Sequence, residues 1–152
     1  MRLVKNIPLD TTIIESLISD PDDLHLVWPN ANYPFDRQQW KEILNPEQGN
    51  IPFLVYDDSE LIGHASIGKT EEDYTFNLNL LFVSPTKRSL GLGEKMIDLL
   101  EQYARERLFA QKLCLVVRSY NPRAHKCYTK CGFQEIDRED TLIKMQKILP
   151  RI

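Results

Sequence analysis

Eighteen residues, Asn79 to Met96 (NLLFVSPTKRSLGLGEKM), decide the fold that we expect of this chain. The apolar beginning predicts a strand, and the end starts an amphipathic helix. The turn between them carries Arg88, Gly91 and Gly93. Glycines let a ligand approach the backbone, and the first amides of a helix have no partner within it. With the helix dipole, these amides predict a site for phosphate oxygens.

Length and composition favour one globular domain spanning residues 1–152. The 152 residues are 42% hydrophobic and 27% charged, which is enough apolar material for one core. A net charge of −3 and a pI near 5.6 argue against general nucleic-acid binding. No apolar run reaches membrane-spanning length, and the first residues lack the apolar core of a signal peptide. We therefore expect a cytoplasmic protein without membrane or nucleic-acid partners.

Three cysteines do not form a disulfide framework in a chain of this length. Cys127 and Cys131 stand one helical turn apart near His125, which raises the question of a metal. Three potential ligands without a second cluster favour free thiols instead. We expect no metal.

The first fifty residues predict one strand and two helices. A strand is expected over residues 2–6, and Thr12 and Glu15 have the spacing of a capping box for a first helix that ends near Asp20-Pro21. Residues 22–35 are irregular and rich in aromatic residues and proline, which predicts a loop. A second helix over residues 37–44 follows.

The second helix begins with a capping pair, Asp36 and Gln39, and Phe35 and Trp40 are spaced as a hydrophobic staple around it. The aromatic residues of this region either seal the helices against the sheet or face a substrate. The sequence leaves both interpretations open for Trp28, Tyr33 and Phe35.

The middle of the chain predicts three consecutive strands, over residues 52–56, 61–68 and 74–84. The last of these alternates cleanly, so one face should carry Tyr74, Phe76, Leu78, Leu80 and Phe82. After the glycine turn, apolar residues recur with a period of 3.6 through residue 108, which predicts a long helix.

The last third predicts a buried strand, a helix and a strand pair. Residues 113–117 are nearly all apolar, as in a strand buried on both faces. Asn121-Pro122 opens a helix that Gly132 closes. Residues 133–136 and 141–149 read as two strands around a charged turn. The chain is therefore expected to have an α/β architecture with its ligand where a strand meets its helix.

Two common phosphate-binding motifs do not fit the glycine turn. A P-loop requires lysine after its last glycine, where Glu94 stands. A dinucleotide fingerprint requires a third glycine where Met96 stands.

Two blocks of sequence resemble the GNAT superfamily of acyl-CoA-dependent N-acetyltransferases, over about residues 52–136. The Arg/Gln-x-x-Gly-x-Gly/Ala signature after a Val-x-Pro strand end is met by Val83, Pro85, Arg88, Gly91 and Gly93. A second block is met by Asn121, Ala124, Tyr128, Lys130, Gly132 and Phe133.

The resemblance implies a mixed, mostly antiparallel sheet of six to seven strands, flanked by about four helices and splayed at an acyl-CoA cleft. It implies an acyltransferase with acetyl-CoA as cosubstrate. The residues that would bind acetyl-CoA are Leu81, Phe82, Val83, Arg88, Ser89, Leu90, Gly91, Leu92, Gly93 and Asn121. An amide near Leu81 or Phe82 would stabilise the oxyanion.

The resemblance also implies that Tyr128 protonates the departing CoA thiolate, since a phenol keeps its proton at pH 7. Tyr128 would otherwise be a core aromatic residue, and Asn121 would otherwise be only a helix cap.

The general base is left unassigned. Several members of the superfamily carry a glutamate where this chain has Asn77, and asparagine takes no proton. Glu72, Asp73 and His64 are candidates, and an amine that arrives neutral needs no base.

The acceptor would be an amine of a small molecule or a protein, near Trp28, Tyr33, Phe35, Asn77 and Asn79. Edge strands near the C-terminus are compatible with a homodimer. Two alternatives stay open at this point, namely a non-catalytic acyl-CoA-binding module and an interaction domain that exposes its aromatic residues.

Overall fold

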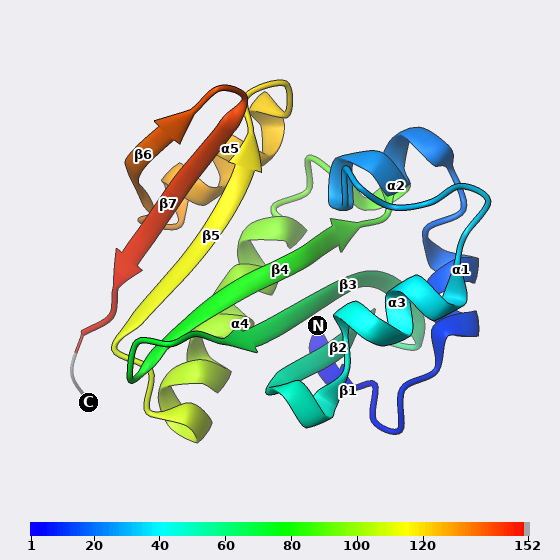
Figure 1. Cartoon of the computed structure of the whole chain (residues 1–152), viewed down its shortest axis with the longest axis horizontal. Helices are drawn as coiled ribbons and strands as arrows, with labels where there is room; N and C mark the ends of the chain where they lie inside the picture. Colours follow the sequence, from blue (N-terminus) through cyan, green and yellow to red (C-terminus); the bar gives the residue numbers. More distant parts are fainter. Residues whose placement is uncertain (151–152) are drawn as a thin grey trace.

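The computed structural model describes residues 1–150, which form a seven-stranded sheet with helices on both faces (Figure 1). The strands are β1 (Arg2–Lys5), β2 (Asn50–Asp57), β3 (Glu60–Lys69), β4 (Thr75–Val83), β5 (Lys112–Arg118), β6 (Gln134–Glu139) and β7 (Leu142–Ile148). The helices are α1 (Thr11–Leu17), α2 (Pro21–Val27), α3 (Arg37–Ile43), α4 (Leu92–Leu108) and α5 (Pro122–Lys130), with short 3-10 turns at Pro46–Gln48 and Pro85–Lys87.

The strand order is β1-β2-β3-β4-β5-β7-β6, and among these described strands only the β4–β5 pair is parallel. The prediction of a mixed, mostly antiparallel sheet with six to seven strands is confirmed. None of the helices within residues 1–150 is both long and apolar enough to cross a membrane.

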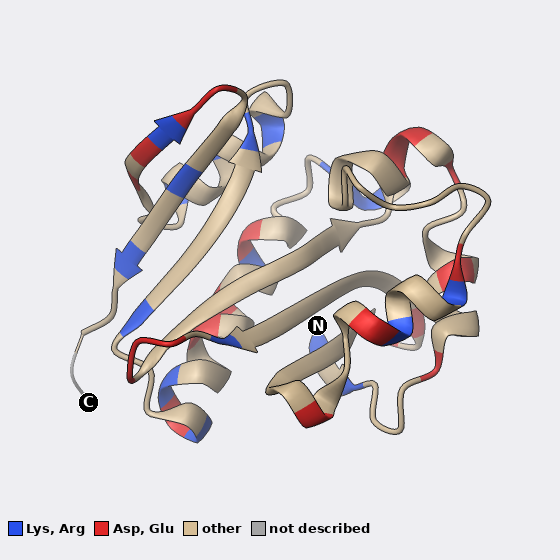
Figure 2. Ribbon diagram, in the orientation of Figure 1, with Lys and Arg blue, Asp and Glu red and all other residues tan. Residues whose placement is uncertain are grey.

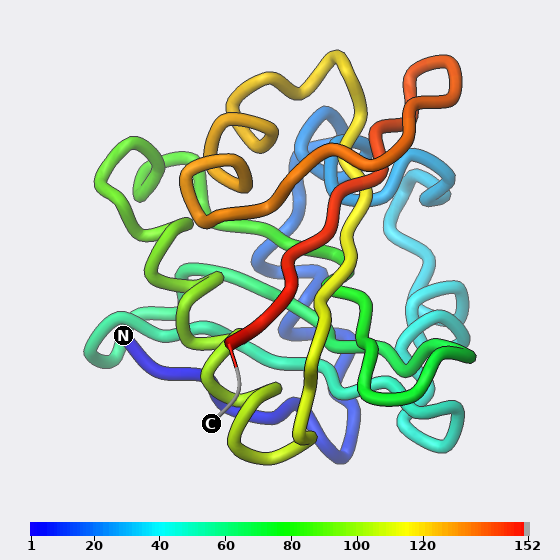
Figure 3. Tube along the Cα trace, turned by 90° about the vertical axis from the view of Figure 1, so that its left-hand side faces the viewer, coloured from blue at the N-terminus to red at the C-terminus, as the bar shows by residue number. Residues whose placement is uncertain are grey.

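Helices lie on both faces of the sheet (Figure 3), and each face has its own core. On one face α4 and α5 cover a large cluster that includes Leu78, Ile97, Leu100 and Leu113. On the other face α1, α2 and α3 cover a smaller cluster built around Trp40, which is fully buried. We refer below to the α4 face and the α3 face of the sheet.

The sheet splits between β4 and β5. Their pairing comprises three positions, Thr75 to Asn77 opposite Lys112 to Cys114, and beyond these the two strands diverge (Figure 1). From Asn79 onward, the β5-facing edge of β4 therefore has backbone groups without a strand partner among residues 1–150.

A β-bulge lies in β4 beside the split. Ser66 pairs with Asn79 and His64 with Phe82, so two residues, Leu80 and Leu81, stand opposite one. Leu80 has a φ of 53°, a left-handed conformation that is uncommon for leucine.

The bulge overturns the predicted alternation of β4. Leu78 belongs to the core of the α4 face, but Leu80 and Phe82 belong to that of the α3 face, where they contact α1–α3. The extra residue shifts every later side chain to the opposite face.

The imidazole of His64 holds the bulge in place. Its Nδ1 donates a hydrogen bond to the Leu80 carbonyl oxygen at 2.9 Å, and its ring packs edge-on against Trp40. His64 is fully buried, and this burial lowers its pKa to about 4.

The expected loop over residues 22–35 is wrong in its first part, because α2 occupies Pro21–Val27. Asp20 accepts hydrogen bonds from the amides of Asp22 and Asp23, and Pro21 takes the first helical position. The Asp-Pro pair that seemed to end one helix begins another.

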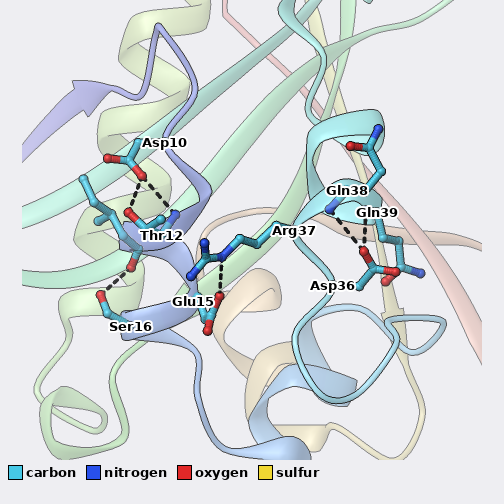
Figure 4. Close-up of polar contacts among 9 residues, drawn as sticks. Asp10, Thr12, Glu15, Ser16, Asp36, Arg37, Gln38 and Gln39 are labelled. Carbon is cyan, nitrogen blue, oxygen red and sulfur yellow. Dashed lines mark hydrogen bonds and ion pairs between the residues drawn. The ribbon is translucent and has the colours of Figure 1, made fainter.

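Figure 4 shows the caps of α1 and α3 and the ion pair that lies between them. Asp10, not the predicted Thr12, caps α1, and Asp36 caps α3 as predicted by accepting from the amides of Gln38 and Gln39. An ion pair between Arg37 Nε and Glu15 at 2.8 Å joins the two helices.

The C-terminal strands differ from expectation in two ways. β5 is not buried on both faces, because Val116 is 55% exposed beside the split. The turn between β6 and β7 is shorter than predicted, since β6 continues to Glu139.

We predict that protonation of His64 destabilises the fold in acid. The imidazole has a pKa near 6.5 in the unfolded chain and near 4 in the folded one. The stability that the neutral imidazole contributes is therefore fully present above pH 6.5. It should fall by about 3 kcal/mol as the pH drops from 7.5 to 4. Urea unfolding across this range measures the slope.

The His64→Gln variant should lose most of that slope, whereas His125→Gln, which changes a partly exposed imidazole on α5, should keep it. Equal slopes in the wild type and in His64→Gln would contradict the assignment.

Candidate active site

A cavity of about 760 Å³ passes through the sheet where β4 and β5 part. Its walls come from α4 and α5 on one face of the sheet and from the end of α2 and the segment after it on the other. Figure 2 shows that β4 carries no charged residue and that β5 carries charge only at its two ends. The middle of the cavity is therefore apolar or neutral, and its charges lie toward its ends.

The first turn of α4 opens onto the cavity. Gly91 is the N-cap in a left-handed conformation (φ 75°), and no side chain caps the helix. A Cβ on Gly91 would meet nothing within 4 Å, and one on Gly93 would meet only the Cys127 sulfur. The first amides of α4 are thus bare and accessible, which is the arrangement that binds a phosphate.

Basic side chains surround this turn. Arg88, Arg123, Lys126 and Lys130 line the cavity, and the acidic residue among them, Glu94, lies 3.8 Å from Lys130 Nζ. Burial and the charge of Arg88 lower the pKa of Arg123. Cations and bare amides together fit the phosphate groups of CoA.

Arg88 is held in place by three contacts. Its Nε donates to the Val83 carbonyl oxygen at 2.8 Å, its Nη2 lies 3.3 Å from Asp23, and its guanidinium stacks on the Phe82 ring. The side chain therefore connects the glycine turn to β4 and α2, which fixes the position of the turn.

The unpaired edge of β4 forms one wall. Leu81, Phe82 and Val83 line the cavity after the last β4–β5 pair. Free N–H and C=O groups on this edge can pair with an extended ligand as another strand would.

Tyr128 lies on α5 against the same cavity. It is 9% exposed and packs edge-on against Phe133. Burial raises the pKa of Tyr128 well above its usual range, so the phenol keeps its proton throughout the neutral range.

Two further residues of α5 line the cavity. Asn121 caps the helix, its Oδ1 accepting from the Ala124 amide at 3.4 Å, so the side chain is engaged in the way that its place before Pro122 favours. Cys127 accepts a hydrogen bond from the Cys131 thiol, which lowers the pKa of Cys127. Within residues 1–150 no three His, Cys, Asp or Glu side chains are arranged to hold a metal ion.

The structure places most of the predicted CoA residues together and separates the predicted acceptor residues. Leu90 is exposed away from the cavity and Leu92 points into the core, so their contribution is limited to backbone groups. On the acceptor side Trp28 and Asn79 line the cavity. Tyr33, Phe35 and Asn77 do not, since Tyr33 is 58% exposed and Phe35 stacks on Trp40.

The candidates for a general base do not reach the cavity. Glu72 pairs with Lys112 Nζ at 2.9 Å in the turn before β4, and neither it nor Asp73 lines the cavity. His64 is enclosed behind the bulge against Trp40.

Sequence reasoning missed two polar residues, Asn50 and Ser66, that line the acceptor side. Ser66 lies on a strand that was predicted without an acceptor-binding role, and Asn50 begins β2, two residues before the start predicted for that strand. Pairing Ser66 with Asn79 would have required the register of β3 on β4, which no local pattern gives.

The arrangement agrees with a family model for the acetyltransferase (GNAT) family, which matches residues 14–133. The chain belongs to the GNAT acetyltransferase family. Members of this family use acetyl-CoA as the acetyl donor, and the bare amides and cations around α4 fit that cosubstrate. No curated protein matches the chain in sequence.

Solved structures resemble the chain along nearly its whole length. A spermidine N-acetyltransferase from Vibrio cholerae, in complex with CoA and spermine, is 19% identical with a TM-score of 0.79 and covers 97% of this chain and 94% of its own. The N-acetyltransferase PseH from Campylobacter jejuni is 18% identical with a TM-score of 0.73 and covers 98% of each chain. At this identity the likeness shows that this GNAT chain shares their fold.

We predict that Arg123→Gln weakens CoA binding about tenfold, because one charge-assisted contact to a phosphate is lost. Calorimetric titration with CoA measures the affinity, and the salt dependence of CoA binding should be weaker in the variant. Arg138→Gln, which changes an arginine of β6 paired with Glu135, is the control and should bind CoA as the wild type does. Equal affinities for the two variants would exclude Arg123 from the phosphate site.

Proposed function

We propose that this GNAT acetyltransferase transfers the acetyl group of acetyl-CoA to a primary amine by direct attack, with Tyr128 as the proton donor to the CoA thiolate. The main support is that one cavity joins the two faces of the sheet beside Tyr128. Phosphates would bind at the α4 end, and an amine would enter from the α3 face. The acceptors in the names of the structural neighbours, spermidine among them, support an amine as the acceptor class.

Three parts of the chain would bind acetyl-CoA and stabilise the negative charge that develops during the reaction. The amides of Gly91 to Gly93, with the nearby cations, would hold the pyrophosphate, and the edge from Leu81 to Val83 would align the pantetheine. Binding far from the reacting atoms would thus position the acyl carbon. An amide beside the bulge, at Leu81 or Phe82, would stabilise negative charge on the acyl oxygen.

The reaction transfers one acetyl group and moves one proton. The amine nitrogen forms a bond to the acyl carbon while the bond from carbon to sulfur breaks. Tyr128 gives its proton to the sulfur, and the proton released by the amine nitrogen replaces it through solvent.

The proposed function is tested by thiol release from acetyl-CoA with a panel of primary amines, with mass spectrometry of the acetylated product. Release that depends on an added amine supports it. Release without an amine would indicate a hydrolase, and CoA binding without any release would indicate a non-catalytic binding module.

We predict that Tyr128→Phe lowers kcat about a hundredfold, because a positioned proton donor typically contributes that much or more. CoA affinity and thermal stability should stay near those of the wild type, since the ring and its contact with Phe133 remain. An unchanged kcat with every active amine would exclude the proton-donor role.

We predict that the rate follows the ionisation of the acceptor. The carboxylate that lines the cavity within the described residues, Glu94, is paired with Lys130, so the amine must arrive neutral. Below the pKa of the amine, kcat/KM should rise about tenfold per pH unit. For an amine of lower pKa, this rising limb of the pH profile should lie at lower pH. A limb that stays at the same pH for both amines would reveal a base on the enzyme.

A further inference from the structure

The acceptor end of the cavity has a polar but uncharged floor. Asn50, Ser66 and Asn79 line it from β2, β3 and β4. Ser66 and Asn79 are direct partners in the β3–β4 ladder, so their side chains lie on the same face. Leu78 packs on the α4 face, which places Asn79 on the α3 face.

Ser66 is buried with its hydrogen-bonding capacity unused. The residue is 1% exposed, and its Oγ has no hydrogen-bond partner within residues 1–150. A buried hydroxyl without a partner costs free energy unless a ligand supplies one. Because Ser66 lines the cavity, the partner it lacks would come from the acceptor.

The two asparagines face a gap beside Ser66. Asn50 Nδ2 donates to the Asn45 carbonyl oxygen at 3.2 Å, which leaves Asn50 Oδ1 free to accept. A Cβ on Gly68 would lie 3.2 Å from that Oδ1 and 3.0 Å from Asn79 Nδ2. The missing side chain of Gly68 therefore leaves an acceptor and a donor on either side of one small space.

The charge around this floor opposes a polycation. No Asp or Glu of the described residues lines the cavity on the α3 face, since Glu94 lies on α4 and is paired with Lys130. Arg118 lines the cavity from the end of β5, where its Nη1 donates to Thr141 Oγ1. A second ammonium group would meet no countercharge here and would lie in the field of a guanidinium.

We infer that the acceptor has one amino group, which reacts as the neutral amine, and that its other end carries an uncharged hydrogen-bonding group, a hydroxyl or an amide, bound by Asn50, Ser66 and Asn79. A polyamine is selected against. This inference rests on the proposed function, and it separates this chain from the spermidine N-acetyltransferase that shares its fold.

Aminopentanol and cadaverine test the inference, because the two amines differ in one terminal group, a hydroxyl in place of an ammonium. The wild type should show at least tenfold higher kcat/KM for aminopentanol. The corresponding carboxamide, tested in parallel, tells a hydroxyl preference from an amide preference. Equal or better use of cadaverine would overturn the inference.

Asn79→Asp should move selectivity about tenfold toward cadaverine, because it places a carboxylate of the same shape at the floor. The matched control is Asn77→Asp, the same change two residues earlier on β4, outside the cavity lining. It should leave the ratio unchanged. The same shift in both variants would place recognition elsewhere.

Ser66→Ala should lower kcat/KM for aminopentanol about fivefold and leave CoA affinity unchanged. An unchanged value would remove Ser66 from the acceptor site. Calorimetry of the CoA-saturated protein with aminopentanol distinguishes the two levels of failure. Binding of aminopentanol without thiol release with any amine would contradict the proposed function but leave the recognition by Asn50, Ser66 and Asn79 standing. Turnover that favours cadaverine would support the proposed function and overturn the inference.

Discussion

The site depends on the interruption of one hydrogen-bonded ladder. β4 and β5 pair over three positions and then separate, and every functional group described above lies along that opening. Parallel pairing is slightly less stable per residue than antiparallel pairing, and here the helices that follow the two strands, α4 and α5, share one core on the same face of the sheet. The freed edge of β4 would be costly if it were buried without partners, so a ligand that pairs with it is stabilising.

The bulge at Leu80 turns this opening into a passage between the two faces. Without it, Leu80 would point to the α4 face as Leu78 does, and the strand would keep one apolar stripe. The hydrogen bond from His64 to the Leu80 carbonyl holds the left-handed leucine, a conformation that costs about 1 kcal/mol or more unless its surroundings impose it. The neutral imidazole, buried against Trp40, thus fixes the backbone of the bulge and does not act as a base.

Local chemistry explains what the sequence could predict. Periodicity predicted α4, the strand pattern predicted β2 to β4, and the spacing of glycines before a helix predicted the turn whose bare amides open onto the cavity. Leu80, in contrast, carries no sign of a positive φ, since a bulge at leucine arises from the register of β3 and the departure of β5. The short helix α2 was missed because Asp20-Pro21 serves equally well as an end or as a beginning, and one buried residue, Leu24, gives no period to detect. Ser66 and Asn50 were missed for a related reason, since only strand pairing brings them beside Asn79.

Two features of the cavity act in opposite directions on the ionisation of Tyr128. Cations near α4 favour a tyrosinate, yet burial outweighs them and the phenol stays protonated. Such a phenol is a weaker acid than a free thiol, whose pKa is about 8.5, so a stepwise transfer of its proton to a thiolate would run uphill. The transfer is favourable only when the proton released by the attacking nitrogen replaces it in the same turnover. A neutral acceptor end would assist the proposed exchange, because a carboxylate there would favour the ammonium form of the acceptor, whose nitrogen has no lone pair with which to attack the acyl carbon.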